Sequence, residues 1–269
     1  MRRFTLPIVI VASILVAALL TWIALSSANF GNRTPRAESP GGRETMVADS
    51  LPSFRRIEVS GSADVTLVQG ETESVSFGAA SRKQGAVRAE VRGDTLHIRA
   101  GDRAHWWTIV FGNESHPSQV VVTFKEIDSI EAAGTVKLSA GALKAGDLRI
   151  SGAGGTSVRI DDLTARQLTV NGAGALKAEL AGRADDQDVT ISGAGTYRGA
   201  RLVTQNAKVT VSGAGKVVVN AEKTLRATIS GAGSVEYLGD PAVTERVSGA
   251  GSVRRRSATD RATRVAFAD

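Results

Sequence analysis

The chain has 269 residues, with 29 glycines, no cysteine, 4% aromatic residues and a formal net charge of +6 at pH 7. The absence of cysteine excludes disulfides, thiolate metal sites and cysteine nucleophiles. With so few aromatic side chains, a core must be built from small and β-branched residues, which suits a thin, regular stack. Outside the two ends of the chain, Lys and Arg are interspersed with Asp and Glu, so no nucleic-acid partner is expected.

Residues 1–30 are predicted to direct the chain to a membrane. Arg2 and Arg3 precede an uncharged run from Phe4 to Phe30, and about 20 apolar residues suffice to span a bilayer as a helix. The arginines would stay on the cytoplasmic side and place the rest of the chain outside. The run is longer than most signal peptides, which favours a retained anchor, but Ser26–Ala28 also offers small residues for cleavage.

Residues 31–50 are polar, rich in Pro and Gly and without periodicity, which predicts a flexible linker. We expect one domain to follow at 51–253, with a basic tail at 254–269. Within the domain, 51–130 predicts alternating strands and 131–253 contains the repeats described next.

A Ser-Gly-Ala-Gly motif, with Asn in place of Ser in one copy, occurs six times in the second half of the chain, at intervals of 18 to 21 residues. A degenerate copy, Glu131–Gly134, precedes them, and Ser60–Ala63 is a diverged form. Each copy follows a short strand of alternating apolar and polar residues, such as Leu148–Ile150. The copies are Ser151–Gly154, Asn171–Gly174, Ser192–Gly195, Ser212–Gly215, Ser230–Gly233 and Ser248–Gly251.

Glycine adopts positive φ at little cost, so the motif is expected to turn the chain at a corner. A serine repeated at one position can also form a hydrogen-bonded ladder with its neighbours. The predicted fold is all-β: a right-handed parallel β-helix, or solenoid, with coils of about 20 residues, preceded by one N-terminal transmembrane or signal helix. The predicted structural turn glycines are Gly152, Gly154, Gly172, Gly174, Gly193, Gly195, Gly213, Gly215, Gly231, Gly233, Gly249 and Gly251.

The order and spacing of these features resemble the putative auto-transporter adhesin head GIN domain family. The resemblance covers Leu51 to Val253 and implies an exported or membrane-associated β-helical protein, without an established activity. It rests on the repeats and on apolar and glycine positions in the first strands, namely Phe54, Ile57, Val59, Gly61, Asp64–Gly70, Leu96–Ile98, Val120–Phe124, Ile127 and Ile130.

An aromatic cluster formed by Trp106, Trp107 and Phe111 is the candidate binding site. Exposed aromatic residues often anchor carbohydrate or protein contacts, although the same cluster could cap an end of the stack. Arg254–Arg256 is predicted to leave the repeat pattern. These arginines would either prevent stacking between molecules or contact anionic lipid or polysaccharide.

Catalytic and metal sites are not predicted. The aspartates at 161–162, 185–186 and 188 fall near predicted corners, where Asp is common in turns; catalysis and calcium binding are the lesser alternatives. His97, His105 and His116 lack the spacing of metal ligands.

The sequence therefore predicts a non-enzymatic, exported cell-envelope β-helix acting as an adhesin-like binding or scaffold module without a cofactor. Its expected partners are the membrane, through residues 1–30, and an envelope polysaccharide or another protein. It would be anchored in the inner membrane with its β-helix in the periplasm, or secreted if the signal is cleaved. The alternatives are a polysaccharide lyase or hydrolase built on a β-helix, and an envelope-stress scaffold.

Overall fold

A computed structural model of the chain describes residues 51–78, 87–101 and 117–256, and all regular structure in these ranges is β-strand. No helix there is long and apolar enough to cross a membrane. The predicted anchor at 1–30 and linker at 31–50 lie outside the described residues. The strands are β1 (Arg56–Gln69), β2 (Ser74–Phe77), β3 (Val87–Arg92), β4 (Thr95–Ala100), β5 (Ser118–Phe124), β6 (Ser129–Gly193), β7 (Thr196–Gly213), β8 (Lys216–Gly231), β9 (Ser234–Leu238), β10 (Ala242–Ser248) and β11 (Ser252–Arg255).

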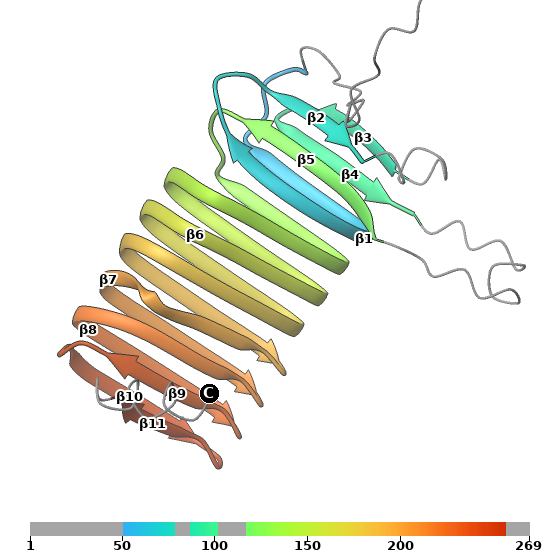
Figure 1. The fold of residues 1–269 in the computed structure, drawn as a ribbon. Coiled ribbons are helices and arrows are strands. Elements are labelled where there is room, and N and C mark those ends of the chain that lie inside the picture. Colours follow the sequence, from blue (N-terminus) through green and yellow to red (C-terminus); the bar gives the residue numbers. More distant parts are fainter. Residues whose placement is uncertain (1–50, 79–86, 102–116, 257–269) are drawn as a thin grey trace, which may run out of the picture. The chain divides into compact units, whose positions relative to one another are not determined.

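Parallel pairing between successive passes of the chain organises the second half of the domain. β6 pairs with β7, β7 with β8, and β8 with both β9 and β10, always in parallel. The register places Gly193 opposite Gly213, and Gly213 opposite Gly231. The chain thus returns to the same position after about 20 residues, and each return adds one layer to a stack, as Figure 1 shows.

The alternating strands predicted for the first part of the domain are confirmed. They lie at the end of the parallel stack that begins with β1. β1 pairs in parallel with β4, β5 and β6. Beyond it, β3 pairs antiparallel with β4 and β2 antiparallel with β5. β2 to β5 therefore gather at the β1 end of the stack in Figure 1.

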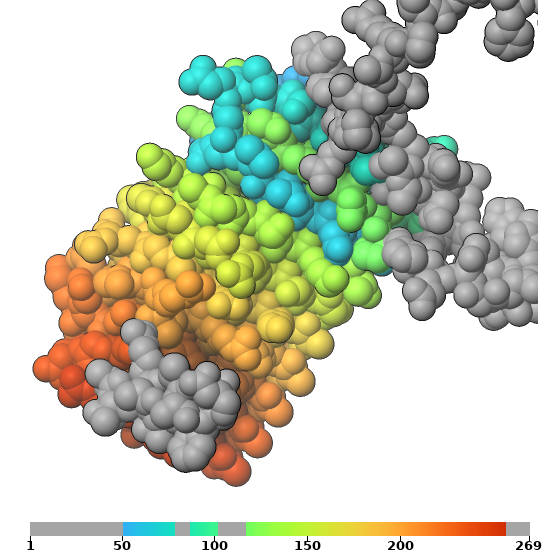
Figure 2. Space-filling view, in the orientation of Figure 1, coloured from blue at the N-terminus to red at the C-terminus, as the bar shows by residue number. Residues whose placement is uncertain are grey.

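The core follows the alternation seen in the sequence. Leu148 and Ile150 are 2% and 1% exposed, and the corresponding apolar residues of the following layers, as far as Ile229, are equally buried. The stack is filled mainly by Val, Ile, Leu and Ala, with Phe54 and Phe124 near the β1 end. The core predicted from the scarcity of aromatic residues is therefore present. Figure 2 shows the outer side of the stack, on which successive layers lie against one another.

One glycine per layer lies directly above a glycine of the layer before. All members of this glycine column have positive φ, between 91° and 132°. From Gly154 onward, a Cβ atom would lie only 2.6–3.1 Å from the carbonyl oxygen of the preceding member. Both the backbone conformation and the close approach therefore require glycine. The column consists of Gly61, Gly134, Gly154, Gly174, Gly193, Gly213, Gly231 and Gly249.

The two glycines of each motif differ in role, which corrects the expectation that both turn a corner. In the earlier copies the second glycine joins the column, as Gly154 does, whereas from Gly193 onward the first glycine does. The other member lacks positive φ and packs against side chains instead. A Cβ on Gly172 would meet Leu176, and one on Gly195 would meet Ile191.

A chain of hydrogen bonds crosses the interior near β7. The Tyr197 hydroxyl donates to Gln187 Oε1 at 3.0 Å, and Gln187 Nε2 donates to Thr204 Oγ1 at 2.8 Å. The Thr204 hydroxyl in turn donates to the carbonyl oxygen of Asn220 at 2.9 Å. Burial of Tyr197 raises the pKa of its phenol well above the ordinary value, because the phenolate would be desolvated.

Gly213→Ala is expected to lower the free energy of unfolding by at least about 2 kcal/mol, since a Cβ disfavours the left-handed backbone and meets Gly193. The matched control is Gly146→Ala, because a Cβ there has no neighbour within 4 Å and φ is not positive. Urea denaturation of both variants measures the difference. Equal stability of the two would contradict the role assigned to the column.

The buried phenol predicts a loss of stability in alkali. The unfolded state ionises near the ordinary pKa of 10, while the folded state keeps its proton, so stability falls as pH rises above 10. The slope due to Tyr197 is about 1.4 kcal/mol per pH unit. Tyr197→Phe should remove this part of the slope while lowering stability at neutral pH, because Gln187 Oε1 loses its donor. Denaturation at pH 8 to 11 tests this, and an identical slope in the variant would refute it.

Candidate functional site: a basic cleft on the last layers

A bulge in β7 makes one corner of the stack uneven. Arg198 and Val203 of β7 lie opposite Val218 and Asn220 of β8, so the four residues 199–202 oppose Val219 alone. Asn220 Nδ2 donates to the carbonyl oxygen of Ala200 at 3.5 Å and ties the bulge to the next layer. The layer that follows the bulge is therefore narrower at this corner.

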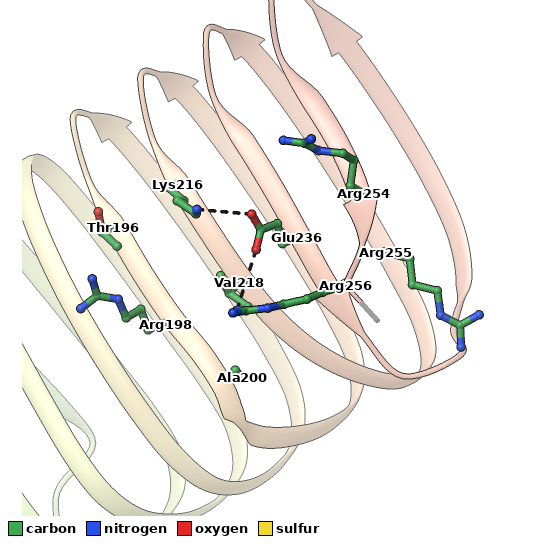
Figure 3. A pocket seen from close by; sticks show the side chains of 9 residues that line it. All are labelled: Thr196, Arg198, Ala200, Lys216, Val218, Glu236, Arg254, Arg255 and Arg256. Atoms are coloured by element: carbon green, nitrogen blue, oxygen red, sulfur yellow. Dashed lines mark ion pairs between the residues drawn. The ribbon is translucent and has the colours of Figure 1, made fainter. Parts of the chain in front are cut away.

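A cleft of about 710 Å³ opens beside the bulge, across β7, β8, β9 and β11 (Figure 3). Its lining carries five cationic side chains and one carboxylate. We call it the basic cleft; its residues are Thr196, Arg198, Ala200, Lys216, Val218, Glu236, Arg254, Arg255 and Arg256.

Glu236 is the centre of the ion pairs in the basic cleft. Its Oε1 lies 3.3 Å from Lys216 Nζ, and its Oε2 lies 3.8 Å from Arg256 Nη1. The Glu236 side chain is 22% exposed, and Figure 3 shows it between the two cations. A single carboxylate thus holds two cations and leaves the cleft strongly positive.

The side chains of two arginines of the basic cleft, Arg198 and Arg254, make no hydrogen bond or ion pair with any other residue that the structure describes. Arg198 lies in register with Glu179 of the layer before. The Glu179 carboxylate, however, pairs with Arg201 at 3.2 Å and with Arg159 at 3.8 Å. The guanidinium of Arg198 therefore remains available to a ligand.

Arg255 lies at the rim of the basic cleft. It pairs with Asp240 at 3.1 Å, and its side chain is directed away from Glu236 in Figure 3. Arg254 and Arg255 belong to β11, which pairs in parallel with β9. The regular structure thus extends beyond the predicted boundary at Val253, and the expectation that these arginines leave the repeat pattern is wrong for both.

The repeats contain a signal for this site that the sequence analysis did not use. Arg198, Val218, Glu236 and Arg254 all stand three positions after the last glycine of a motif. In the structure they form one register across four layers. Aligning the repeats residue by residue would have brought these side chains together.

The other candidate residues are dispersed or lie outside the described ranges. Trp106, Trp107 and Phe111 are outside them, as are His105 and His116. The role of the aromatic cluster therefore stays a prediction.

His97 lies in β4, with its Nδ1 2.9 Å from Glu58 Oε2, and its side chain is partly exposed. No group of three or more acidic or histidine residues able to hold a metal occurs in the described part of the chain.

The aspartates engage in contacts along and between layers. Asp161 pairs with Arg159 at 3.0 Å. Asp185 accepts a hydrogen bond from Gln205 at 2.9 Å, and the Gln205 side chain accepts one from Lys223 at 2.8 Å. These aspartates therefore contribute to surface contacts of the stack.

A second ladder of side-chain hydrogen bonds joins three successive layers. Asn206 Nδ2 donates to Asp186 Oδ1 at 2.9 Å, and the Thr224 hydroxyl donates to Asn206 Oδ1 at 2.8 Å. The expectation of a hydrogen-bonded ladder at the motif serines is wrong for Ser192 and Ser212. These two residues are in register, but no hydrogen bond joins their side chains.

Asp186 and Asp188 nevertheless line a common groove of about 410 Å³, together with Lys208 and Arg226. Two residues apart in a strand, they point to the same face. Lys208 Nζ lies 2.8 Å from Asp188 Oδ2, while Asp188 Oδ1 is buried without a partner among the described residues.

Solved structures share this fold. A protein described as a putative adhesin from Bacteroides fragilis matches with a TM-score of 0.69 and 18% identity, over 80% of this chain and 98% of its own. A putative lipid binding protein from Parabacteroides distasonis matches with 0.60 and 21%, over 80% and 96%. A putative adhesin from Parabacteroides merdae matches with 0.59 and 20%, over 79% and 95%. At these identities the likeness concerns the fold alone.

Among curated proteins, no relative matches this sequence. The profile of one protein family does match, over residues 53–241, which is most of the chain and includes β1 to β9. The resemblance seen in the sequence is thereby confirmed, and the chain belongs to the family described as "Putative auto-transporter adhesin, head GIN domain".

Proposed function

We propose that this chain is a non-enzymatic, exported binding or scaffold module of the bacterial cell envelope, adhesin-like in its action and built as a right-handed parallel β-helix. The regular return of the chain after about 20 residues supports the β-helix. Membership of the family described as "Putative auto-transporter adhesin, head GIN domain" supports the adhesin-like function.

The observation that carries the proposal is the contrast between the two grooves. In the groove of Asp186 and Asp188, each carboxylate already contacts a side chain of the next layer. In the basic cleft, Arg198 and Arg254 have no partner among the described residues. Unpaired guanidinium groups in a concave surface favour the binding of a ligand. Among the described residues that line the cleft, no second carboxylate is present to act with Glu236 as an acid–base pair.

The membrane is the first partner in this proposal. Residues 1–30 would hold the chain in the inner membrane and place the β-helix in the periplasm, or would release a secreted protein after cleavage. The second partner would be an envelope polysaccharide or another protein. A scaffold that acts in envelope stress would have the same architecture, but unlike a polysaccharide-binding module it would not need to bind a glycan.

A carbohydrate-active enzyme is the alternative that one observation favours. Asp186 and Asp188 lie on one face of one groove, and Asp188 Oδ1 lacks a partner among the described residues. Two carboxylates flanking a glycosidic bond are the usual requirement for its hydrolysis. The contacts to Asn206 and Lys208 favour a structural role for both.

The test is a panel of envelope glycans presented to the purified full-length chain, with binding and product formation measured on the same samples. We expect binding without shortened or unsaturated products. If products form and disappear in the Asp186→Asn/Asp188→Asn double variant, the enzyme alternative replaces the proposal. The variant also serves as a control, because it should leave binding unchanged.

The aromatic cluster provides a separate test of where binding occurs. Trp106→Ala/Trp107→Ala should abolish binding with an unchanged melting temperature if these residues form the ligand site. Lower stability would instead indicate that they cap the stack, and unchanged binding would exclude them as the ligand site.

A further inference from the structure

We infer that the basic cleft binds an acidic polysaccharide, whose repeated anionic groups contact Arg198 and Arg254 as the polymer lies along the stack. This inference rests on the proposed binding function and names the ligand class of its site. The shared chemistry is an oxyanion, carboxylate or phosphate, that a guanidinium group binds through two parallel hydrogen bonds.

The spacing of the two free arginines calls for a ligand with more than one charge. The register runs from Arg198 through Val218 and Glu236 to Arg254, one residue per layer. Three steps of about 4.8 Å separate the two ends by roughly 14 Å of backbone. A single small anion would contact one arginine only, whereas an extended polymer with regularly spaced charges contacts both.

The middle of the register leaves room for a polysaccharide chain to pass over it. Val218 faces outward, yet it is only 5% exposed, and it forms a low apolar floor between Arg198 and Glu236. Glu236 holds Lys216 and Arg256 in place. Because its carboxylate already pairs with both cations, it also competes with an anionic ligand for them.

The chemistry of the lining distinguishes this ligand from other polyanions. Single-stranded nucleic acids are usually bound by stacking of their bases on aromatic side chains, and no aromatic residue is found among the described residues that line the basic cleft. Lipid surfaces are usually bound with exposed apolar residues that enter the interface. The large exposed apolar residues of the described chain, Val68, Val121, Val243 and Val247, all lie outside the cleft lining.

Binding of the full-length chain in detergent to polygalacturonate, a phosphate-bearing teichoic acid and neutral dextran tests the inference. We expect binding to at least one acidic polymer, none to dextran, and weaker binding as salt rises. Arg198→Gln/Arg254→Gln should weaken it about tenfold or more, as expected when charge-assisted hydrogen bonds are lost. Arg149→Gln, which removes an exposed arginine far from the cleft, should leave it unchanged.

Glu236→Gln provides a test in the opposite direction. Removing the competing carboxylate frees Lys216 and Arg256, so the affinity for the acidic polymer should rise. A role of Glu236 in stability alone would instead lower or preserve affinity, and melting temperatures separate the two. Together, a loss in the arginine variant and a gain in this one cannot arise from partial unfolding.

Several outcomes would overturn the inference. Equal binding of the wild type and the Arg198→Gln/Arg254→Gln variant would remove the cleft as the site. Preference for single-stranded DNA or for vesicles containing anionic lipid over both acidic polymers would replace the ligand class. Binding of dextran or another neutral glycan alone would refute the inference while leaving the proposed binding function intact, and cleavage of the polymers would refute the proposed function itself.

Discussion

The contact between stacked glycines determines how the layers of this domain fit together. From Gly134 onward, each member of the glycine column lies so close to the carbonyl oxygen of the member before it that a Cβ atom would not fit between them. The left-handed backbone places that approach at one corner of every layer. Because a side chain at any member would separate two layers, the column fixes the register of all strands that follow it. The outward residues of successive layers therefore stand above one another, and functional side chains can form lines across the stack.

The same register explains why the residue type alone does not tell whether a polar surface side chain is paired with the next layer or available to a ligand. Carboxylates that look reactive in the sequence, such as Asp185 and Asp186, meet amides of the next layer and form ladders. Arginines that look like a solvated tail, Arg254 and Arg255, lie in the last strand. Which groups remain available depends on what the neighbouring layer offers. Arg198 is free because Glu179, its neighbour in register, is already held by Arg159 and Arg201.

Much of the fold could be predicted from local patterns, because the alternation around Leu148 and Ile150 and the recurring motif have direct physical meanings. Which glycine of a motif joins the column could not be predicted: it is the second glycine at Gly174 but the first at Gly193. The two motifs differ only at their first residue, and that residue does not determine which glycine has positive φ. The basic cleft required an alignment of repeats rather than a search for reactive clusters. Its only trace was a shared offset from the motif, at positions whose residue types differ from layer to layer.

The bulge at residues 199–202 has a consequence for how such a protein can diversify. Four residues there oppose one residue of the next layer, yet Gly193 and Gly213 stay paired and regular pairing with β8 resumes at Asn206. Insertions and deletions at this corner thus reshape the outside of the molecule without disturbing its interior. Related chains can acquire new recesses by changing loop length at one edge, much as antibody domains vary their loops on a constant framework.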